Sequence, residues 1–422
     1  LRYRAVQIPD VPPQLLAAMV EAAAGQRLAL VGGVVRDLLL HRHHQEPWRG
    51  LPDLDLVIEG RVADLVARLP LALEHHFGVP VPLRHQYHDY YGTVAVELQL
   101  PLKYGGVFWL DLASARQEHY LRAGDNPKIS PTTIEKDLAR RDLTINAMAI
   151  MLPTSERFIS DNYELLDPFS GLMDLICKQI RFLHSDSLRD DPSRIFRACR
   201  YSARLGFVLT NDARKLIIDT INDWPWVSHP VGNAQSTLAS MGTRLRAELE
   251  ILLQSSHWQE GIKVLQQCEG LKLLDLQVQE DPHLLLKCHW AERFDVPKII
   301  AVVISAENPI TLAARLNMPH EQQTDIASAL ELCNSLREIK DEHLKPSEWC
   351  SIFERKPLNY RSVMLALIHG AQPRGQIIRW AHLWRLIKSP VTAKELLRQG
   401  WTPGPEISQE LRIRRALIID SQ

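Results

Sequence analysis

The fold is decided by Leu28-Ala29-Leu30-Val31-Gly32-Gly33-Val34-Val35-Arg36-Asp37, a short apolar run followed by two glycines and a new apolar pattern. The run predicts a strand, and residues 34–40 predict a helix that begins directly after the glycines. Glycine lets the backbone approach a phosphate closely, and a helix N-terminus offers N–H donors to an anion. The stretch therefore predicts an anion-binding turn made by Gly32, Gly33 and Arg36. The alternative is a tight turn in which Arg36 and Asp37 form a surface pair.

A pair of aspartates follows in Leu51-Pro52-Asp53-Leu54-Asp55-Leu56-Val57, which is another strand-like run. Side chains alternate across a strand, so Asp53 and Asp55 are expected to point to the same face. Adjacent carboxylates repel each other unless a cation lies between them, and Mg²⁺ prefers one or two carboxylates together with phosphate oxygens. The pair therefore predicts a metal site for phosphoryl or nucleotidyl transfer. The alternative is a polar edge strand with an aspartate in a turn.

A third candidate carboxylate is Asp111, near the end of the strand-like run Val107 to Leu112. Its alternative interpretation is an aspartate that ends a strand or caps a helix. The combination of motifs is more specific than any one of them. A phosphate-binding turn shortly before an Asp-x-Asp strand would bring a triphosphate and its metal ions to one place.

The order of the predicted elements indicates an α+β protein, with a head that contains a small mixed sheet and an all-helical remainder. Strands are predicted at 28–31, 55–58, 93–98 and 107–112, and a loop at 124–131. Amphipathic helices dominate after Ile134, and no block rich in strands is expected after Asp167. Three of these helices are predicted at 194–205, 241–253 and 324–336.

An arginine-rich helix is predicted to begin after Asp191-Pro192 and to carry Arg194, Arg197 and Arg200 as a stripe. A solvated basic face is the ordinary meaning of such a stripe. Asp191 and Arg194 can also act as a pair that accepts one hydrogen bond and donates another. Cytosine and adenine both present an amino donor beside a ring acceptor, whereas uracil and guanine present the reverse order. One Asp–Arg pair would therefore select C and A.

A second basic cluster is Asp137-Leu138-Ala139-Arg140-Arg141-Asp142-Leu143-Thr144-Ile145-Asn146. Arg140 or Arg141 is predicted to contact a triphosphate, and Asn146 a ribose or a loop. Asp142 is included among the predicted nucleotide-binding residues. The alternative is a cluster of salt bridges at the start of a helix.

The composition describes an ordinary globular chain, 45% hydrophobic and 23% charged, with a formal net charge of −1. No membrane-spanning run or signal-peptide layout is evident. The six scattered cysteines argue against a disulfide framework and favour a reducing cytoplasm. Near neutrality disfavours a large non-specific RNA surface. His41, His43 and His44 could form a metal site, but an exposed loop of solvated histidines is the favoured interpretation.

Taken in order, these motifs resemble the class II tRNA nucleotidyltransferases (CCA-adding enzymes) and the bacterial poly(A) polymerases. The resemblance covers about residues 29–206 and is carried by Gly-Gly-x-Val-Arg-Asp, Asp-Leu-Asp, Arg-Arg-Asp-Leu-Thr-Ile-Asn-Ala, Asp-Pro-Phe-Ser-Gly-Leu-x-Asp and Asp-Asp-Pro-Ser-Arg-x-x-Arg-Ala-x-Arg. It implies a head (1–155), a neck that reads the nucleotide base (156–255), and a body and tail that bind tRNA (256–422).

The resemblance also implies a reaction. Mg²⁺ would be held by Asp53 and Asp55, the donors would be ATP and CTP, and the acceptor would be the 3′ end of tRNA. The base would be chosen without a nucleic-acid template. The nucleotide pocket would be built from residues of the motifs quoted above: Gly32, Gly33, Arg36, Arg140, Arg141, Asp142, Asn146, Asp191, Arg194, Arg197 and Arg200.

Two features leave the exact reaction open. The family's usual Glu-Asp-x-x-Arg is Asp190-Asp191-x-x-Arg194 here, which retains the Asp–Arg pair but leaves open whether one enzyme would add the whole CCA or only the terminal A. Residues 116–140 retain the length of a loop that is shortened in CC-only members. A poly(A) polymerase is the second interpretation, and a catalytically inactive RNA-binding relative is an interpretation of another class.

Overall fold

The computed structural model describes residues 8–44, 53–120, 124, 126–155, 163–223, 235–339 and 344–422. Contacts divide the chain into two compact units, residues 1–241 with 256–268 and residues 242–255 with 269–422. The named strands all belong to the first unit. The predicted α+β architecture, a head with a mixed sheet and helices after it, is confirmed. The division at residues 155 and 255 stays a prediction.

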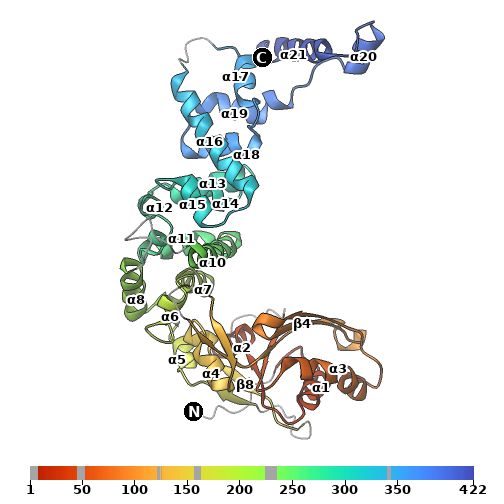
Figure 1. Cartoon of the computed structure of the whole chain (residues 1–422), viewed down its shortest axis with the longest axis vertical. Coiled ribbons are helices and arrows are strands. Elements are labelled where there is room, and N and C mark those ends of the chain that lie inside the picture. Colours follow the sequence, from red (N-terminus) through yellow and green to blue (C-terminus); the bar gives the residue numbers. More distant parts are fainter. Residues whose placement is uncertain are drawn as a thin grey trace. The chain divides into compact units, whose positions relative to one another are not determined.

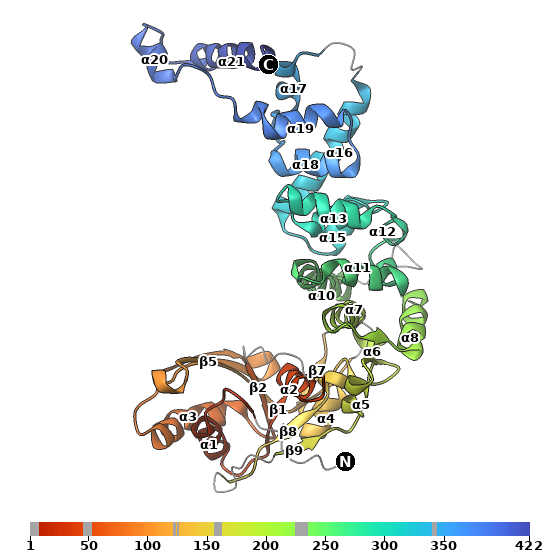
Figure 2. The same ribbon diagram turned by 180° about the vertical axis from the view of Figure 1, so that it is seen from behind.

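The first unit is built on a seven-stranded mixed sheet (Figures 1 and 2). β2 lies near its centre, antiparallel to β1 and parallel to β5, and the other pairings are antiparallel. The strand order is β3 (Leu83–His88), β4 (Thr93–Gln99), β5 (Val107–Ser114), β2 (Leu54–Ile58), β1 (Leu28–Val31), β8 (Ala149–Met151) and β9 (Glu164–Leu166).

One face of this sheet is covered by α1 (Pro13–Ala23) and α3 (Val62–Phe77), which pack against each other. Figure 1 shows both helices on the same side of the sheet. Alternate residues of β4 and β5 are buried on that side, among them Val94, Val96 and Leu110. Since side chains alternate along a strand, the residues between them lie on the opposite face. That opposite face carries Asp55 and Asp111.

A second group of elements adjoins β1 and β8. α2 (Gly33–His44) leaves β1 directly, and α4 (Ile134–Ala139) packs its Ile134 and Leu138 into a core with Ala29 and Val57. The chain then passes through a 3₁₀ turn, η3 (Thr144–Asn146), α5 (Gly171–Ile176) and α6 (Ser187–Asp190) to α7 (Arg194–Leu205). α8 (Asn211–Asn222) follows, and α11 (Trp258–Gln267) packs on α7.

The structure contains elements that the sequence analysis did not predict, among them β3, β6 (Arg116–His119), β8 and β9. Gly124–Pro131 was predicted as a loop, but Lys128–Pro131 form β7, which pairs with β6. After Asp167 the two-residue strands β10 (Gln179–Ile180) and β11 (Val208–Leu209) form a small parallel ladder that was not predicted. These strands are short and paired over a distance in sequence, so local patterns do not reveal them.

The histidines at 41, 43 and 44 were interpreted as an exposed loop. His41 and His43 are exposed as expected, but the loop was wrong, because all three residues form the last turn of α2. The Nε2 atom of His44 lies 2.9 Å from the carbonyl oxygen of Leu175. Imidazoles near a helix C-terminus are favoured by the carbonyl acceptors and the dipole there.

The second unit consists of helices in its described part. It includes the C-terminal portion of α10 (Gln235–Gln254), which crosses α15 so closely that a Cβ on Gly242 would lie 1.9 Å from the carbonyl oxygen of Arg315. No described helix is both long enough and apolar enough to cross a bilayer. The other α-helices are α12 (Leu276–Glu280), α13 (Leu284–Arg293), α14 (Lys298–Val303), α15 (Pro309–Arg315), α16 (His320–Glu338), α17 (Pro346–Phe353), α18 (Tyr360–His369), α19 (Arg374–His382), α20 (Ala393–Arg398) and α21 (Pro405–Asp420).

Candidate active site

Three carboxylates lie on the face of the sheet opposite α1 and α3. Asp55 in β2 is the direct register partner of Asp111 in the parallel strand β5. Register partners in a sheet point to the same face, so these two side chains lie side by side. Asp53 precedes β2 by one residue and is exposed. Within the described part of the chain, no choice of one oxygen from each of these carboxylates brings all three oxygens within 4.8 Å of one another.

The electrostatics of this group favour a cation. Partial burial, with the charges of Asp111 and Asp53 adding to it, raises the pKa of Asp55 to about 6, against the opposing effect of the Arg141 guanidinium. Burial and the charge of Asp53 also raise the pKa of Asp111. The charge of His88 acts in the opposite direction and lowers that pKa. Like charges this close disfavour each other's ionisation, and a bound cation reverses that preference. The donor set of carboxylate oxygens fits a hard divalent metal.

The glycine turn lies directly against Asp55. Gly32 has a φ of +74°, and a Cβ at this position would lie 3.1 Å from Oδ2 of Asp55 and 3.3 Å from Nη1 of Arg141. Position 32 therefore requires glycine for two reasons. Its backbone conformation favours glycine, and a side chain there would crowd the Asp55 carboxylate. Gly33 begins α2, so the helix N-terminus faces the same region. An anion held here would meet N–H donors and the positive end of the helix.

Arg36 is buried and joins several elements, so it does not form the surface pair with Asp37 that was the alternative interpretation. Its side chain is 2% exposed. Its Nε donates to Asp37 at 2.8 Å, and its Nη1 donates to Oδ1 of Asn146 at 2.7 Å. The guanidinium also lies 4.9 Å from the ring centroid of Tyr201 in α7. Arg36 thus ties α2 to η3 and α7, and these contacts fix the direction of the helix that carries the glycine turn.

A buried network continues from Asn146 to α7. The amide of Asn146 donates to Asp142 at 3.4 Å, and Arg197 donates to the same carboxylate through its Nε at 2.6 Å. Burial alone would raise the pKa of Asp142, but the charge of Arg197 and its hydrogen bond, with help from Arg194, hold that pKa at about 2. Asp142, Asn146 and Arg197 therefore hold the head elements and α7 together.

The two arginines of the basic segment have different surroundings. Arg140 donates to Glu118 and to Asp137, each at 2.9 Å, as the salt-bridge alternative describes. Arg141 shares Asp137 at 3.3 Å and reaches the glycine turn beside Asp55. Arg141 is therefore the better placed of the pair to meet an anion at the carboxylates.

The start of α7 is ordered by side chains that sequence reasoning singled out. Asp191 accepts hydrogen bonds from the backbone N–H and the Oγ of Ser193 at 3.0 and 2.6 Å. Arg194 donates to Oγ of Ser187 at 2.7 Å and to the carbonyl oxygen of Arg140 at 2.9 Å. At the start of α7, the carboxylate acceptors of Asp191 thus lie one turn from the guanidinium donors of Arg194.

Two further residues join this site that the sequence analysis did not select. Tyr201 stands beside three guanidinium groups, at 4.9 Å from Arg36, 6.0 Å from Arg197 and 4.9 Å from Arg200. Its spacing of four residues from Arg197 is the signal that could have identified it. Asp137 is fully buried and anchors both arginines of the basic segment. The spacing of three and four residues from Asp137 to the two arginines is the local signal that could have identified it.

Comparisons with known proteins point to one family. Residues 28–181 match the model of the poly A polymerase head domain. The A-adding tRNA nucleotidyltransferase of Aquifex aeolicus is 30% identical over 408 residues, covering 91% of this chain and 44% of the relative. The CC-adding tRNA nucleotidyltransferase of Deinococcus radiodurans is 34% identical over 267 residues, or 62% of this chain and 60% of the relative.

The chain is similar to tRNA nucleotidyltransferases along most of its length, and its head to that of poly A polymerases. Its match spans less than half the length of the Aquifex relative. The fold agrees along the whole chain with the solved structure of a CCA-adding enzyme in an apo form, at a TM-score of 0.72 and 24% identity, over 99% of this chain and 96% of that one. The motifs on the sheet face and on α7 thus occur within a fold that this chain shares with that structure.

Proposed function

We propose that this protein is a template-independent tRNA nucleotidyltransferase, which adds CCA or only the terminal A to the 3′ end of tRNA from CTP and ATP. The observation that carries the proposal is the pairing of Asp55 and Asp111 directly beside the Gly32 turn of α2. That arrangement suits an in-line transfer in which a triphosphate lies at a helix N-terminus next to paired carboxylates. The relatives named above, which are A-adding and CC-adding enzymes, support the same reaction.

The divalent metal of this proposal is Mg²⁺, with Asp53 and Asp55 as its ligands and Asp111 as the third catalytic carboxylate. When bound, the metal would activate the 3′-hydroxyl and neutralise the triphosphate. The raised pKa of Asp55 supports this assignment, because a bound cation would favour the ionised carboxylate against the burial and the neighbouring charges that raise its pKa.

The remaining site residues divide into two roles. Gly32, Gly33 and Arg141 would receive the triphosphate, while Asp191 and Arg194 would read the edge of the incoming base. The other predicted nucleotide-binding residues would hold this pocket in shape through the network described above: Arg36, Arg140, Asp142, Asn146, Arg197 and Arg200. The helical region 256–422 would bind tRNA, the head would be 1–155, and the neck 156–255. The cysteines, which form no disulfide, support a reducing, cytoplasmic location.

Three tRNAs test the reaction: one ending before CCA, one after C and one after CC, each given CTP, ATP or both. Products are resolved at single-nucleotide length. Addition of three nucleotides to the first tRNA would establish a complete CCA-adding enzyme. A single A added only to the CC-ended tRNA would establish an A-adding enzyme.

The same assay separates the alternatives. Long A tails would support a poly(A) polymerase, an interpretation that the head-domain match also favours. Asp55→Ala is the control, and we expect it to lose more than about a hundredfold in transfer while still binding tRNA. Normal turnover by Asp55→Ala would overturn the metal assignment. Absence of extension by the unmodified protein would favour the inactive RNA-binding relative.

A further inference from the structure

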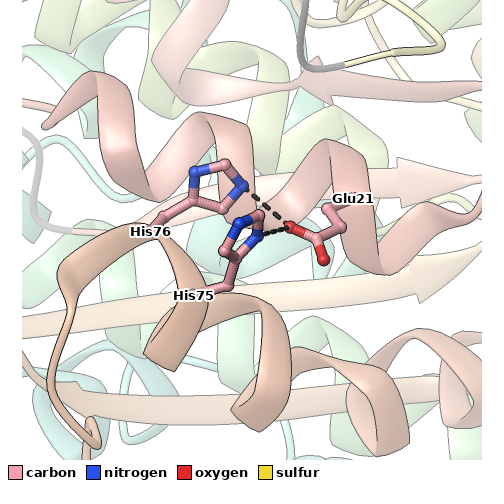
Figure 3. A group of neighbouring side chains, drawn as sticks. All are labelled: Glu21, His75 and His76. Carbon is pink, nitrogen blue, oxygen red and sulfur yellow. Dashed lines mark hydrogen bonds and ion pairs between the residues drawn. The ribbon is translucent and has the colours of Figure 1, made fainter.

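A second cluster of metal-binding side chains lies away from the carboxylates, where α1 meets the C-terminal end of α3. Glu21 comes from α1, and His75 and His76 are consecutive residues of α3 (Figure 3). Nδ1 of His75 lies 2.8 Å and Nε2 of His76 lies 2.9 Å from the same oxygen of Glu21. The ligand atoms of all three residues lie within 4.8 Å of one another.

The chemistry of this cluster fits a borderline transition metal better than Mg²⁺. Imidazole nitrogens and one carboxylate suit Zn²⁺, which takes four ligands at about 2.0–2.2 Å in a tetrahedral arrangement. The three side chains would supply three positions and water the fourth. Around such an ion, neighbouring ligand atoms lie about 3.4 Å apart. Small rotations of exposed side chains would therefore open the observed contacts to accept the ion.

This cluster is separate from the proposed active site. α1 and α3 cover the face of the sheet that buries Val94 and Leu110, whereas Asp55 and Asp111 lie on the opposite face. Nothing in the predicted nucleotidyl transfer uses Glu21, His75 or His76.

We propose that Glu21, His75 and His76 form a Zn²⁺ site that joins α1 to α3 and stabilises the head from behind the sheet. Each residue by itself is an ordinary surface residue. Their convergence from two helices onto one point, with each histidine nitrogen directed at the same carboxylate oxygen, is what points to a shared ion.

The test is Zn²⁺ binding by the full-length protein in the presence of saturating Mg²⁺, measured by competition with a chromophoric chelator. We expect one Zn²⁺ per chain that is lost in His76→Ala and in Glu21→Gln, with at least tenfold weaker binding in each. The control is His85→Ala, an exposed histidine of β3, which should bind as the unmodified protein does. Thermal unfolding should shift upward with Zn²⁺ only where the site is intact.

Two results would overturn the proposal. One is equal Zn²⁺ binding by the unmodified protein and both site variants, which would locate the ion elsewhere. The other is no binding at Zn²⁺ concentrations well above those of the chelator, which would leave a hydrogen-bonded contact between two helices. Neither result bears on nucleotide transfer, so the proposed function is tested separately.

A different observation concerns the open face of the sheet beside the carboxylates, and it rests on the proposed function. Strand register places Asp111 opposite Ala95, and Trp109 opposite Glu97, which in turn pairs with Arg84 at the edge strand. Residues two apart on a strand share a face, so Trp109 lies on the same face as Asp111. Its side chain is 49% exposed, although it belongs to an internal strand.

We infer that Trp109 is a positioning residue for the acceptor, on which an unpaired base at the RNA 3′ end stacks, with Arg84 near its phosphate. A large aromatic surface left open two residues from a catalytic carboxylate suits a base, because every base has a stacking face. The register allows a base on Trp109 to present its ribose toward Asp111. His88, whose charge acts on Asp111, lies toward the other side of that carboxylate.

The inference is tested with two variants, Trp109→Ala and Trp109→Phe. The control is Val107→Ala, which changes a residue of similar exposure on the same face of β5. We expect Trp109→Ala to weaken binding of a short RNA primer by about fivefold to a hundredfold, by fluorescence anisotropy, with the KM for ATP unchanged. The phenylalanine variant should recover most of the affinity, and Val107→Ala should behave as the unmodified protein.

Unchanged primer binding by Trp109→Ala, in a protein that still extends tRNA, would overturn the stacking role and leave the proposed function intact. A raised KM for ATP with normal primer binding would assign Trp109 to the incoming nucleotide and would also overturn it. Failure of the unmodified protein to extend any RNA would instead count against the proposed function.

Discussion

At the scale of single residues, Gly32 shows how a backbone requirement and a chemical one coincide. Its φ of +74° disfavours any residue with a Cβ, and that Cβ would also press on the Asp55 carboxylate at 3.1 Å. The strain of a left-handed backbone costs an alanine about 1–2 kcal/mol. The displaced carboxylate is the larger functional loss, since small shifts of reacting groups reduce rates steeply.

We therefore predict that Gly32→Ala lowers nucleotide transfer by about a hundredfold while the protein stays folded. Gly78→Ala is the matched control, because Gly78 also has a positive φ, +69°, and a Cβ there would meet nothing within 4 Å. Single-turnover rates and thermal unfolding are measured on both variants. Equal rates for the two would mean that the space beside Asp55 does not matter to the reaction.

Asp142 leads to a prediction about pH and stability. Its pKa is about 2 in the folded protein, below the value of an unfolded chain, mainly because Arg197 outweighs the effect of burial. A depressed pKa stabilises the fold at pH values above the unfolded pKa, and this stabilisation is lost as pH falls through the folded pKa. The contribution at neutral pH is about 2 kcal/mol.

We predict that Asp142→Asn lowers the melting temperature at pH 7, and that its difference from the unmodified protein narrows as pH falls from about 4 to about 2. Melting curves across this range provide the measurement. A constant difference at all pH values would show that packing, and not the ion pair with Arg197, accounts for the loss.

The residue scale also shows what sequence could and could not predict. Asp53, Asp55 and the two glycines stand in local patterns, so the chain itself suggests them. The adjacency of Asp111 to Asp55 depends on a parallel register between strands far apart in sequence. Likewise, local patterns could not distinguish Arg140, which is paired with Glu118, from Arg141, which reaches the glycine turn.

At the scale of elements, α7 is anchored by the same residues that the proposed function uses for base reading. The helix covers Arg194–Leu205, as its amphipathic pattern predicted. Arg194 is 8% exposed and bridges Ser187 and the Arg140 carbonyl. Such anchoring restricts the guanidinium to one orientation, which a residue that reads a base requires.

We predict that Arg194→Ala relaxes base choice, with discrimination of CTP and ATP against UTP and GTP falling by about five- to a hundredfold. The measurement is the ratio of kcat/KM values for the four nucleotides. Arg204→Ala is the control on the same helix, because Arg204 is half-exposed and pairs with Asp37 at 3.5 Å. Unchanged ratios in Arg194→Ala would contradict the base-reading role.

Element prediction succeeded where periodicity is long and failed where strands are short. The central strands and the long helices follow from apolar patterns of several residues. β8 and β9 have three residues each, and β3 is an edge strand with mostly exposed side chains. Such strands are stabilised by their neighbours in the sheet rather than by their own composition, so a single sequence signals them weakly.

At the scale of the whole molecule, the net charge is close to zero, yet the second unit has a local basic surface. A pocket of about 540 Å³ is lined by Tyr360, Trp380, Arg385, Lys388 and Arg412, among other residues. Its acidic residue, Glu354, is neutralised by two hydrogen bonds from Arg415, at 2.6 and 2.7 Å. Arg385 stacks on Tyr360 at 4.4 Å. The net charge of −1 therefore does not argue against phosphate contacts at this pocket.

If the second unit holds tRNA while the first performs the chemistry, removing positive charges at this pocket should weaken the binding of tRNA and leave the binding of ATP unchanged. We predict that the double variant Lys388→Ala, Arg412→Ala raises the KM for tRNA and reduces the slope of log affinity against log salt by about 1 per lost contact. The KM for ATP and kcat should not change.

Arg355→Ala is the control, because Arg355 is exposed in the same unit and pairs with Glu331. A salt slope equal to that of the control would exclude phosphate contacts at this pocket, and a fall in kcat alone would tie the pocket to the chemistry instead.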